Sequence, residues 1–145
     1  VTEGLVAGTR LGRALAWRLP ERVDPILDEP RTGLLDASSR VTLRAAMSRH
    51  VGVLRDATGL AVVVDVIGEL ERRVSTAVAP SRRSWEATNL LTVAAAMVAS
   101  AAARTESRGC HRRADWPEAR EIWRTHLEVS MGADGIELSG IPEGV

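Results

Sequence analysis

One apolar run constrains the fold of this chain more than any other feature. Residues 90–103 are apolar apart from Thr92 and Ser100, and alanine is the commonest residue among them. The run is too short and too interrupted to cross a membrane, which takes about 20 apolar residues. A helix that is apolar on all sides belongs at the centre of a domain. We therefore predict a central, buried helix over about residues 85–106, with Ser84 as its N-cap.

The overall composition also favours helices. The sequence has four Trp but neither Phe nor Tyr, and alanine favours helices whereas aromatic residues favour strands. Its 145 residues suffice for one domain with a core. The 19 basic and 19 acidic residues cancel, which argues against a dedicated nucleic-acid binder. The single cysteine, Cys110, excludes an internal disulfide and fits a reducing compartment.

Further helices are predicted before the central one. Residues 2–19 form an amphipathic pattern that Pro20 ends, and glycines at every fourth position would let another backbone approach closely. A Pro-rich connector follows over residues 20–37. The next two helices are expected over residues 39–56 and, with Thr58 as the N-cap, up to about residue 74. Within the latter, the run of three valines at 62–64 would also suit a strand, but the apolar pattern continues to Leu70 and favours a helix.

The last helix is predicted from a capping-box pattern. Asp115 to Glu118 has the spacing of a capping box with Pro117 in the first turn, so a helix should run from there to about residue 127 or 129. The tail from residue 131 is expected to form a short extended turn around Gly135. The predicted fold class is therefore all-α: one helix over residues 1–19, the connector, a bundle of three to four helices over residues 38–130, and a tail over 131–145.

The densest group of titratable residues follows the central helix and consists of Glu106, Arg108, His111 and Asp115. Such a group could perform acid–base chemistry. The alternative is a structural role at a helix end, with Arg108 near the negative end of the helix dipole and Gly109 at the C′ position. We favour the structural role. Cys110 and His111 are adjacent and do not form a catalytic dyad, and the histidines and the cysteine lack zinc-ligand spacing.

Two segments resemble one family. Residues 3–10, Glu-Gly-Leu-Val-Ala-Gly-Thr-Arg, resemble the helix after the last flavin-contacting loop in the flavoproteins of succinate dehydrogenase, fumarate reductase and L-aspartate oxidase. Residues 105–117, Thr-Glu-Ser-Arg-Gly-Cys-His-Arg-Arg-Ala-Asp-Trp-Pro, resemble the Glu-Ser-Arg-Gly-x-His-x-Arg-x-Asp-Tyr/Phe-Pro signature of the C-terminal helical domain of that family. Trp123 and His126 resemble the Trp-x-x-His that follows. Trp116 departs from the usual Tyr or Phe but keeps an aromatic ring.

The resemblance implies an FAD enzyme of which this chain is the C-terminal part. Residues 1–19 would be the last helix of the FAD-binding domain, and residues 38–130 would be the flavoprotein C-terminal domain. The N–H groups of a helix start attract negative charge, so the resemblance implies that the backbone at Val1 lies near the reduced flavin; the alternative is an ordinary helix terminus. The resemblance assigns FAD binding mainly to the missing upstream domain. It assigns no catalytic residue and no metal ligand to this chain, which alone should be inactive.

Within the family, three features resemble the bacterial L-aspartate oxidase branch: Cys110, the double arginine at 112–113, and a short tail of 19 residues after His126. That branch oxidises L-aspartate to iminoaspartate for NAD biosynthesis, and oxygen or fumarate reoxidises the flavin. The implied partners are the upstream FAD-binding and capping domains of the same polypeptide, together with quinolinate synthase, which would use the product. A cytoplasmic protein without a nucleic-acid or membrane partner is expected.

Two alternatives remain open. The first is a fragment of a succinate dehydrogenase or fumarate reductase flavoprotein, which would need iron–sulfur and membrane partners. The second is a non-enzymatic helical interaction module, which a charge-balanced bundle without a catalytic constellation would fit. The chain begins with Val1 rather than Met, and we therefore expect a piece of a longer protein; a coding sequence upstream with an Asn-Ser run would favour the flavoprotein.

Overall fold

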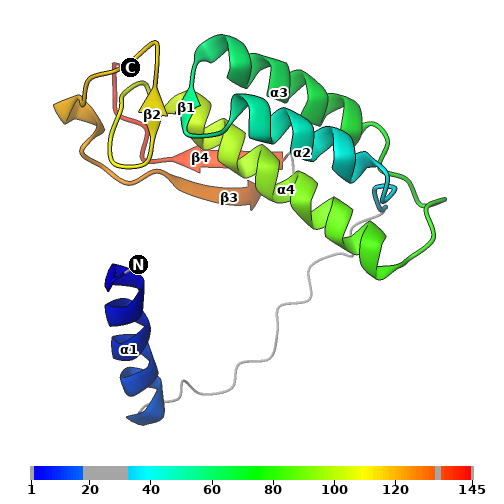
Figure 1. Ribbon diagram of the computed structural model, residues 1–145, viewed down its shortest axis with the longest axis horizontal. Coiled ribbons are helices and arrows are strands. Elements are labelled where there is room, and N and C mark those ends of the chain that lie inside the picture. The colour runs from blue at the N-terminus through cyan, green and yellow to red at the C-terminus, as the bar shows by residue number, and fades with distance from the viewer. Residues whose placement is uncertain (1, 18–32, 133–134, 145) are drawn as a thin grey trace. The chain divides into compact units, whose positions relative to one another are not determined.

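The computed structural model describes residues 2–17, 33–132 and 135–144. The chain divides into two compact units, residues 1–31 and 32–145. The described part of the first unit is helix α1, Thr2–Trp17 (Figure 1), which matches the helix predicted there. Leu5, Leu11 and Leu15 are exposed on it. Val1 and most of the predicted connector lie outside the described residues.

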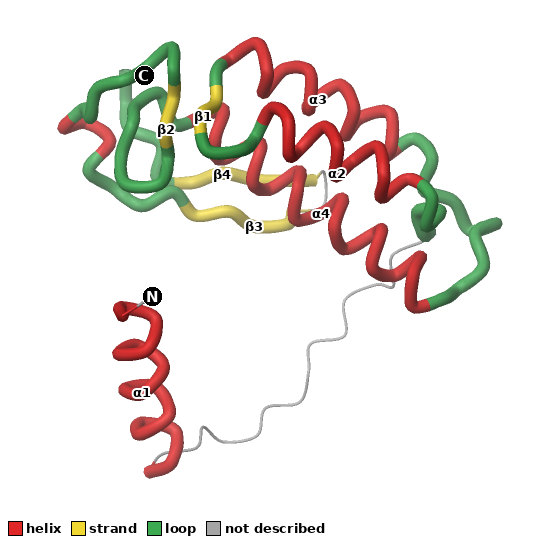
Figure 2. Tube along the Cα trace, viewed as in Figure 1, coloured by secondary structure: helices red, strands yellow, loops and turns green. Residues whose placement is uncertain are grey.

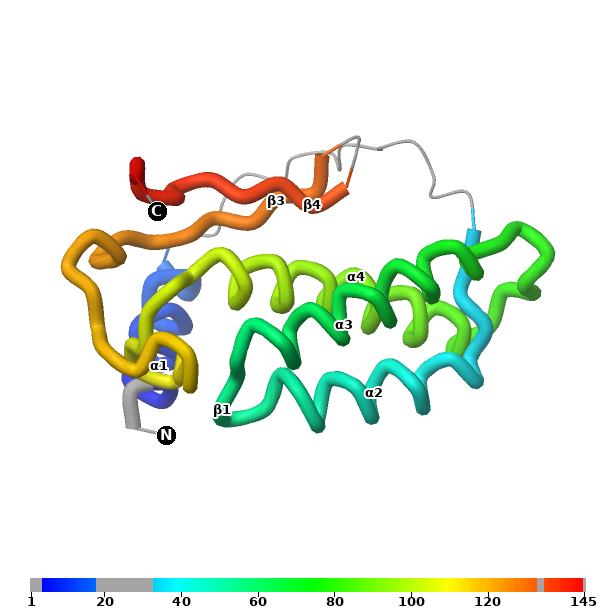
Figure 3. The backbone as a smooth tube through the Cα atoms, turned by 90° about the horizontal axis from the view of Figure 1, so that it is seen from above, coloured from blue at the N-terminus to red at the C-terminus, as the bar shows by residue number. Residues whose placement is uncertain are grey.

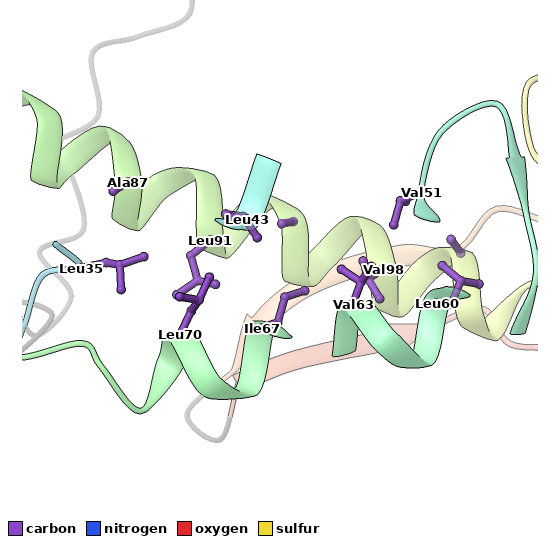
Figure 4. Close-up of a cluster of buried hydrophobic side chains, with 12 residues drawn as sticks. Leu35, Leu43, Val51, Leu60, Val63, Ile67, Leu70, Ala87, Leu91 and Val98 are labelled. Atoms are coloured by element: carbon purple, nitrogen blue, oxygen red, sulfur yellow. The ribbon is translucent and has the colours of Figure 1, made fainter. Parts of the chain in front are cut away.

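The second unit is built on three helices, α2 (Ser39–His50), α3 (Ala57–Glu71) and α4 (Arg82–Ala103) (Figure 2). Their facing sides form one hydrophobic core (Figure 4). Leu35, from the segment assigned to the connector by the sequence pattern, is also fully buried in this core. The buried side chains are Leu35, Leu43, Val51, Leu60, Val63, Ile67, Leu70, Ala87, Leu91, Ala94, Val98 and Ala101.

The helix predicted across the three valines is confirmed, but the caps differ from those predicted. Asp56, not Thr58, caps α3, because its side chain accepts a hydrogen bond from the N–H of Gly59 at 2.7 Å. Ser81, not Ser84, caps α4. Ser84 instead occupies the third helical position and completes a reciprocal capping box, in which its hydroxyl accepts from the N–H of Ser81 at 2.8 Å.

Helix α2 ends at His50 rather than at residue 56 because the following residues pair with a distant segment. Strand β1, Leu54–Arg55, runs parallel to strand β2, Arg112–Arg113, and the N–H of Ala114 donates to the carbonyl of Arg55 at 2.7 Å. Tertiary pairing therefore overrides local helix propensity at this point.

The helix predicted after Pro117 does not form, so the all-α prediction is wrong in part. The chain is mostly helical, but in the described residues the segment after α4 contains, besides β2, only a short 3₁₀ helix, η1 (Glu121–Trp123), and an antiparallel hairpin of β3 (Glu128–Gly132) and β4 (Gly135–Ser139). The carboxylate of Asp115 is engaged by Arg113 and by the N–H of Ala57, and so it does not start a helix of its own. The expected turn at Gly135 is part of the hairpin, where this glycine has a φ of 120°.

Helix α4 is central, but it is not buried on all sides. Leu91, Ala94 and Val98 face α2 and α3, whereas Leu90, Val93 and Met97 are exposed. The expectation of burial all round is therefore wrong for one face. Among the described helices, α4 alone is long and apolar enough to cross a membrane by length and composition, although its apolar run was predicted to be too short. A third of its most apolar window is buried in the structure, and core helices of soluble proteins meet the same criteria.

Candidate functional site: a buried ionic cluster after α4

The carboxylate of Glu106 is the centre of the site. Its side chain is fully buried. Oε1 accepts hydrogen bonds from Arg104 Nη1 at 2.7 Å and from Arg108 Nε at 2.9 Å. Oε2 accepts from Arg108 Nη2 at 3.1 Å and from the backbone N–H of Arg120 at 2.9 Å. Four donors therefore saturate one buried carboxylate, which is the condition under which a buried charge is tolerated.

These donors keep Glu106 ionised. Burial by itself would raise the pKa of the carboxyl group, but the hydrogen bonds from Arg108, from the N–H of Arg120 and from Arg104 outweigh it and lower the pKa to about 2. A general acid or base that works near neutral pH needs a pKa near that pH. Glu106 is therefore suited to holding charges in place and not to transferring protons.

Arg104 joins the end of α4 to the later chain. Besides Glu106, its guanidinium donates to the carbonyl oxygens of Trp123 and Thr125, at 2.8 and 2.7 Å. It also lies over the Trp123 ring, 5.1 Å from the centroid, at a distance where a cation is attracted to an aromatic face. The Trp123 side chain is fully buried, and its Nε1–H donates to Thr105 Oγ1 at 3.0 Å. The irregular segment 104–125 is thereby fixed without a regular helix.

Arg108 lies in a turn and not at a helix end. Helix α4 ends at Ala103, and the backbones of Arg108 and His111 exchange hydrogen bonds of 2.8 and 2.9 Å. Gly109 has a φ of 56° in this turn, a conformation that favours glycine. The C′ position predicted for Gly109 is therefore wrong, although the requirement for glycine is real. In this turn Arg108 pairs with Glu106.

A second ion pair, between Arg113 and Asp115, links the ends of two helices. Arg113 is buried and donates to both carboxylate oxygens of Asp115, at 2.8 and 2.6 Å. Its Nη1 also donates to the carbonyl of Ala101 at 2.8 Å, where a cation complements the C-terminal dipole of α4. Asp115 accepts from the N–H of Ala57 at 3.0 Å, at the N-terminus of α3. The bonds from Arg113 are the main cause that lowers the pKa of Asp115 to about 2.

His111 is held in a defined neutral form. Its Nδ1 lies 3.1 Å from Arg55 Nη1, and its Nε2 lies 3.1 Å from the carbonyl oxygen of Arg104. A guanidinium can only donate, so Nδ1 accepts, and the proton of the neutral ring resides on Nε2 and points to the Arg104 carbonyl. Burial is the largest cause that lowers the pKa of His111, and the charges of Arg55, Arg113 and Arg104 add to it.

The predicted group of four thus separates into three linked pairs rather than one catalytic constellation. Glu106 pairs with Arg108, Asp115 with Arg113, and His111 with Arg55. Sequence reasoning did not single out the roles of Arg104, Arg113 and Arg120. The only sequence feature that could have indicated these roles is the high density of arginines around Glu106. Cys110 is exposed, and the described residues contain no group of three or more side chains that could hold a metal ion.

The arrangement of the cluster is structural. Within the described part of the chain, every buried polar side-chain atom has a hydrogen-bond partner. The buried polar groups of the cluster are therefore all bound within the chain. Val1, the one residue predicted to contact FAD, lies outside the described residues.

A protein-family comparison identifies the chain. Residues 40–139 match the model of the fumarate reductase flavoprotein C-terminal domain. The chain is 39% identical over 113 residues to L-aspartate oxidase of Streptomyces coelicolor, covering 72% of this chain and 20% of that relative. It is also 39% identical over 139 residues to L-aspartate oxidase of Caulobacter vibrioides, covering 94% and 25%. The chain thus spans a fifth to a quarter of the length of these relatives.

Solved structures agree on the fold. Mycobacterium smegmatis Sdh1, in a complex with UQ1, is 30% identical, with a TM-score of 0.56 over 70% of this chain and 19% of that one. Escherichia coli quinol fumarate reductase FrdA has a TM-score of 0.58 over 94% of this chain and 24% of that one. Its identity of 23% shows a common fold alone.

Proposed function

The chain belongs to the family of fumarate reductase flavoprotein C-terminal domains, and from this premise we propose that it is the C-terminal part of an FAD-dependent enzyme that oxidises L-aspartate to iminoaspartate. The single observation that supports this proposal most is the similarity to the L-aspartate oxidases of Streptomyces coelicolor and Caulobacter vibrioides. It reaches 39% identity and extends over 94% of the chain in one relative. FAD, the substrate and the oxidant, oxygen or fumarate, would be bound by the larger part of the enzyme.

The contribution of this chain to that activity is structural. The bonds of Glu106 and Arg104 fix segment 104–125 against the end of α4, and the pair of Arg113 and Asp115 ties that end to the start of α3. When bound, FAD would accept the hydride from the substrate. The described residues of this chain would support the domain that holds the flavin and would not touch the reacting atoms.

A succinate dehydrogenase or fumarate reductase flavoprotein is the second candidate, favoured by the likeness to Sdh1. Aspartate and succinate are both four-carbon dicarboxylates and differ by one amino group. A charge-assisted hydrogen bond to that ammonium contributes roughly 1.5–3 kcal/mol, or about ten- to a hundredfold in rate. The substrate therefore distinguishes the two candidates.

The experiment follows flavin absorbance in the complete flavoprotein, without oxygen, after mixing with L-aspartate or with succinate. Faster flavin reduction by L-aspartate, by about tenfold or more, supports the proposal. Faster flavin reduction by succinate would contradict the proposal and assign the protein to the succinate dehydrogenase branch. We further propose a cytoplasmic enzyme whose product is used by quinolinate synthase; co-purification of the two proteins would test that partnership.

A further inference from the structure

The exposed face of α4 continues onto the hairpin. Leu90, Val93 and Met97 recur at a spacing of three and four residues and so lie on one side of the helix. On the hairpin, Val129 and Met131 alternate with polar residues on strand β3 and therefore share one face. These five side chains, which we call the α4–β3 surface, are between 38% and 56% exposed.

A pocket joins the two halves of this surface. It has a volume of about 520 Å³ and is lined by Met97 of α4 and Val129 of β3, among others. Figure 3 shows the hairpin running alongside α4. Because Met97 and Val129 line the same pocket, the apolar side of β3 faces α4 there, and the pocket leaves an open space between them. An apolar surface of this kind, shared by two elements, is typical of a site that another chain segment covers.

Two arginines line the pocket, Arg55 and Arg104. Arg104 pairs with Glu106, whereas Arg55 takes part in none of the ion pairs among the described residues. Its guanidinium donates to Val51 O and to His111 Nδ1, and no acidic residue lines the pocket. A segment that covers the surface would therefore be mainly apolar and would carry a carboxylate near Arg55.

We propose that the α4–β3 surface is the docking site for the FAD-binding domain of the same polypeptide, through an apolar segment with one carboxylate facing Arg55. This inference rests on the proposed function. The family relatives supply the occupant, because three quarters or more of their length lies outside the segment that matches this chain. A surface that is always covered within one polypeptide has no need of polar side chains, which explains exposed Leu, Val and Met side chains on a charge-balanced protein.

The test measures the accessibility of position 93 in the complete flavoprotein. Val93→Cys and the control Val41→Cys are each made with Cys110→Ser, because Cys110 is exposed. Val41 lies on α2, outside the proposed surface, and is 76% exposed. N-ethylmaleimide labelling is followed by mass spectrometry of the peptide that carries the new cysteine, and each rate is divided by the rate in guanidinium chloride.

The expected result is a labelling rate at position 93 that is reduced by about tenfold or more relative to the unfolded chain, with little reduction at position 41. A benzophenone attached at position 93 should cross-link to the FAD-binding part of the same polypeptide. A reduction at position 93 of less than about threefold contradicts the proposal. So does protection that grows with protein concentration, which indicates a second copy, or protection that needs phosphatidylcholine vesicles, which indicates a membrane surface. Labelling requires no substrate, so its outcome is independent of whether L-aspartate reduces the flavin.

Discussion

Arg55 donates a hydrogen bond to Nδ1 of His111 across 3.1 Å, although the two residues are 56 positions apart. The bond requires a neutral imidazole, because a protonated ring has no acceptor nitrogen. Protonation would also bring a positive charge next to Arg55, Arg104 and Arg113. These contacts make His111 a pH-sensitive part of the junction between β1 and the segment after α4.

Acidification should weaken the fold through His111. Its pKa in the folded chain is lowered below the ordinary value of 6.5, so at pH values between the two the unfolded chain binds more protons. Its contribution to stability is present above pH 6.5 and is lost as the pH falls through the folded pKa. Urea unfolding at a series of pH values should show this loss, and His111→Gln should remove it. A folded-state pKa above 6.5 in a histidine NMR titration would contradict the assignment.

Glu106→Gln should be one of the most destabilising conservative changes in this chain. The substitution leaves the guanidinium groups of Arg104 and Arg108 beside a neutral side chain in a buried site, and breaking a buried ion pair costs about 3–5 kcal/mol. Denaturant unfolding measures the difference. The matched control is Glu121→Gln, which removes an exposed pair with Arg124 and should change the free energy of unfolding by about 1 kcal/mol at most. Equal losses of unfolding free energy for the two substitutions would show that the buried cluster stabilises the fold no more than an exposed ion pair does.

The two acidic residues that border α3 should contribute unequally. Asp56→Ala removes an N-cap, at a cost of about 1 kcal/mol. Asp115→Ala removes the bond to Ala57 and also leaves the buried Arg113 without its carboxylate, at a cost of about 3–5 kcal/mol. The free energy of unfolding of both variants tests this order. A larger loss of unfolding free energy with Asp56→Ala would mean that Arg113 forms an ion pair with another residue when Asp115 is removed.

Helices with a strong local pattern could be predicted from the sequence. The apolar positions of α3 and α4 recur at helical spacing, and their burial follows from that spacing. The predicted N-caps of α3 and α4 were wrong because two residues that can cap a helix lie near the start of each. Ser81 and Ser84 both satisfy the cap rule, and the sequence does not show that they act together as a reciprocal pair.

Segment 104–125 could not be predicted from local pattern because long-range charge contacts determine it. The carboxylate of Asp115 looks like a helix cap in the sequence, but it is bound to the start of α3, 58 residues earlier. The N–H of Arg120, which a helix would have used internally, donates to Glu106. The exposed face of α4 could not be predicted for a related reason. An apolar run indicates that a helix face is buried against something, but it does not show whether the same domain or another one covers that face.

The 145-residue chain alone should not bind FAD or oxidise L-aspartate. Its buried polar groups in the described residues are already satisfied, and the relatives that it matches are about four times as long as this chain. Titration of the purified chain with FAD, followed by flavin fluorescence, checks this prediction. Stoichiometric quenching with micromolar affinity would show that the chain holds a flavin site of its own.

Arg108→Ala in the complete protein tests most directly whether the ionic cluster supports the flavoenzyme without taking part in its chemistry. Arg108 donates to both oxygens of Glu106 and to the carbonyl of Arg120. We expect a lower melting temperature and weaker flavin retention. The rate of flavin reduction by L-aspartate per bound flavin should be unchanged, and the control Arg124→Ala should affect neither property. An unchanged melting temperature and full flavin content, together with a collapsed rate of flavin reduction, would contradict this supporting role.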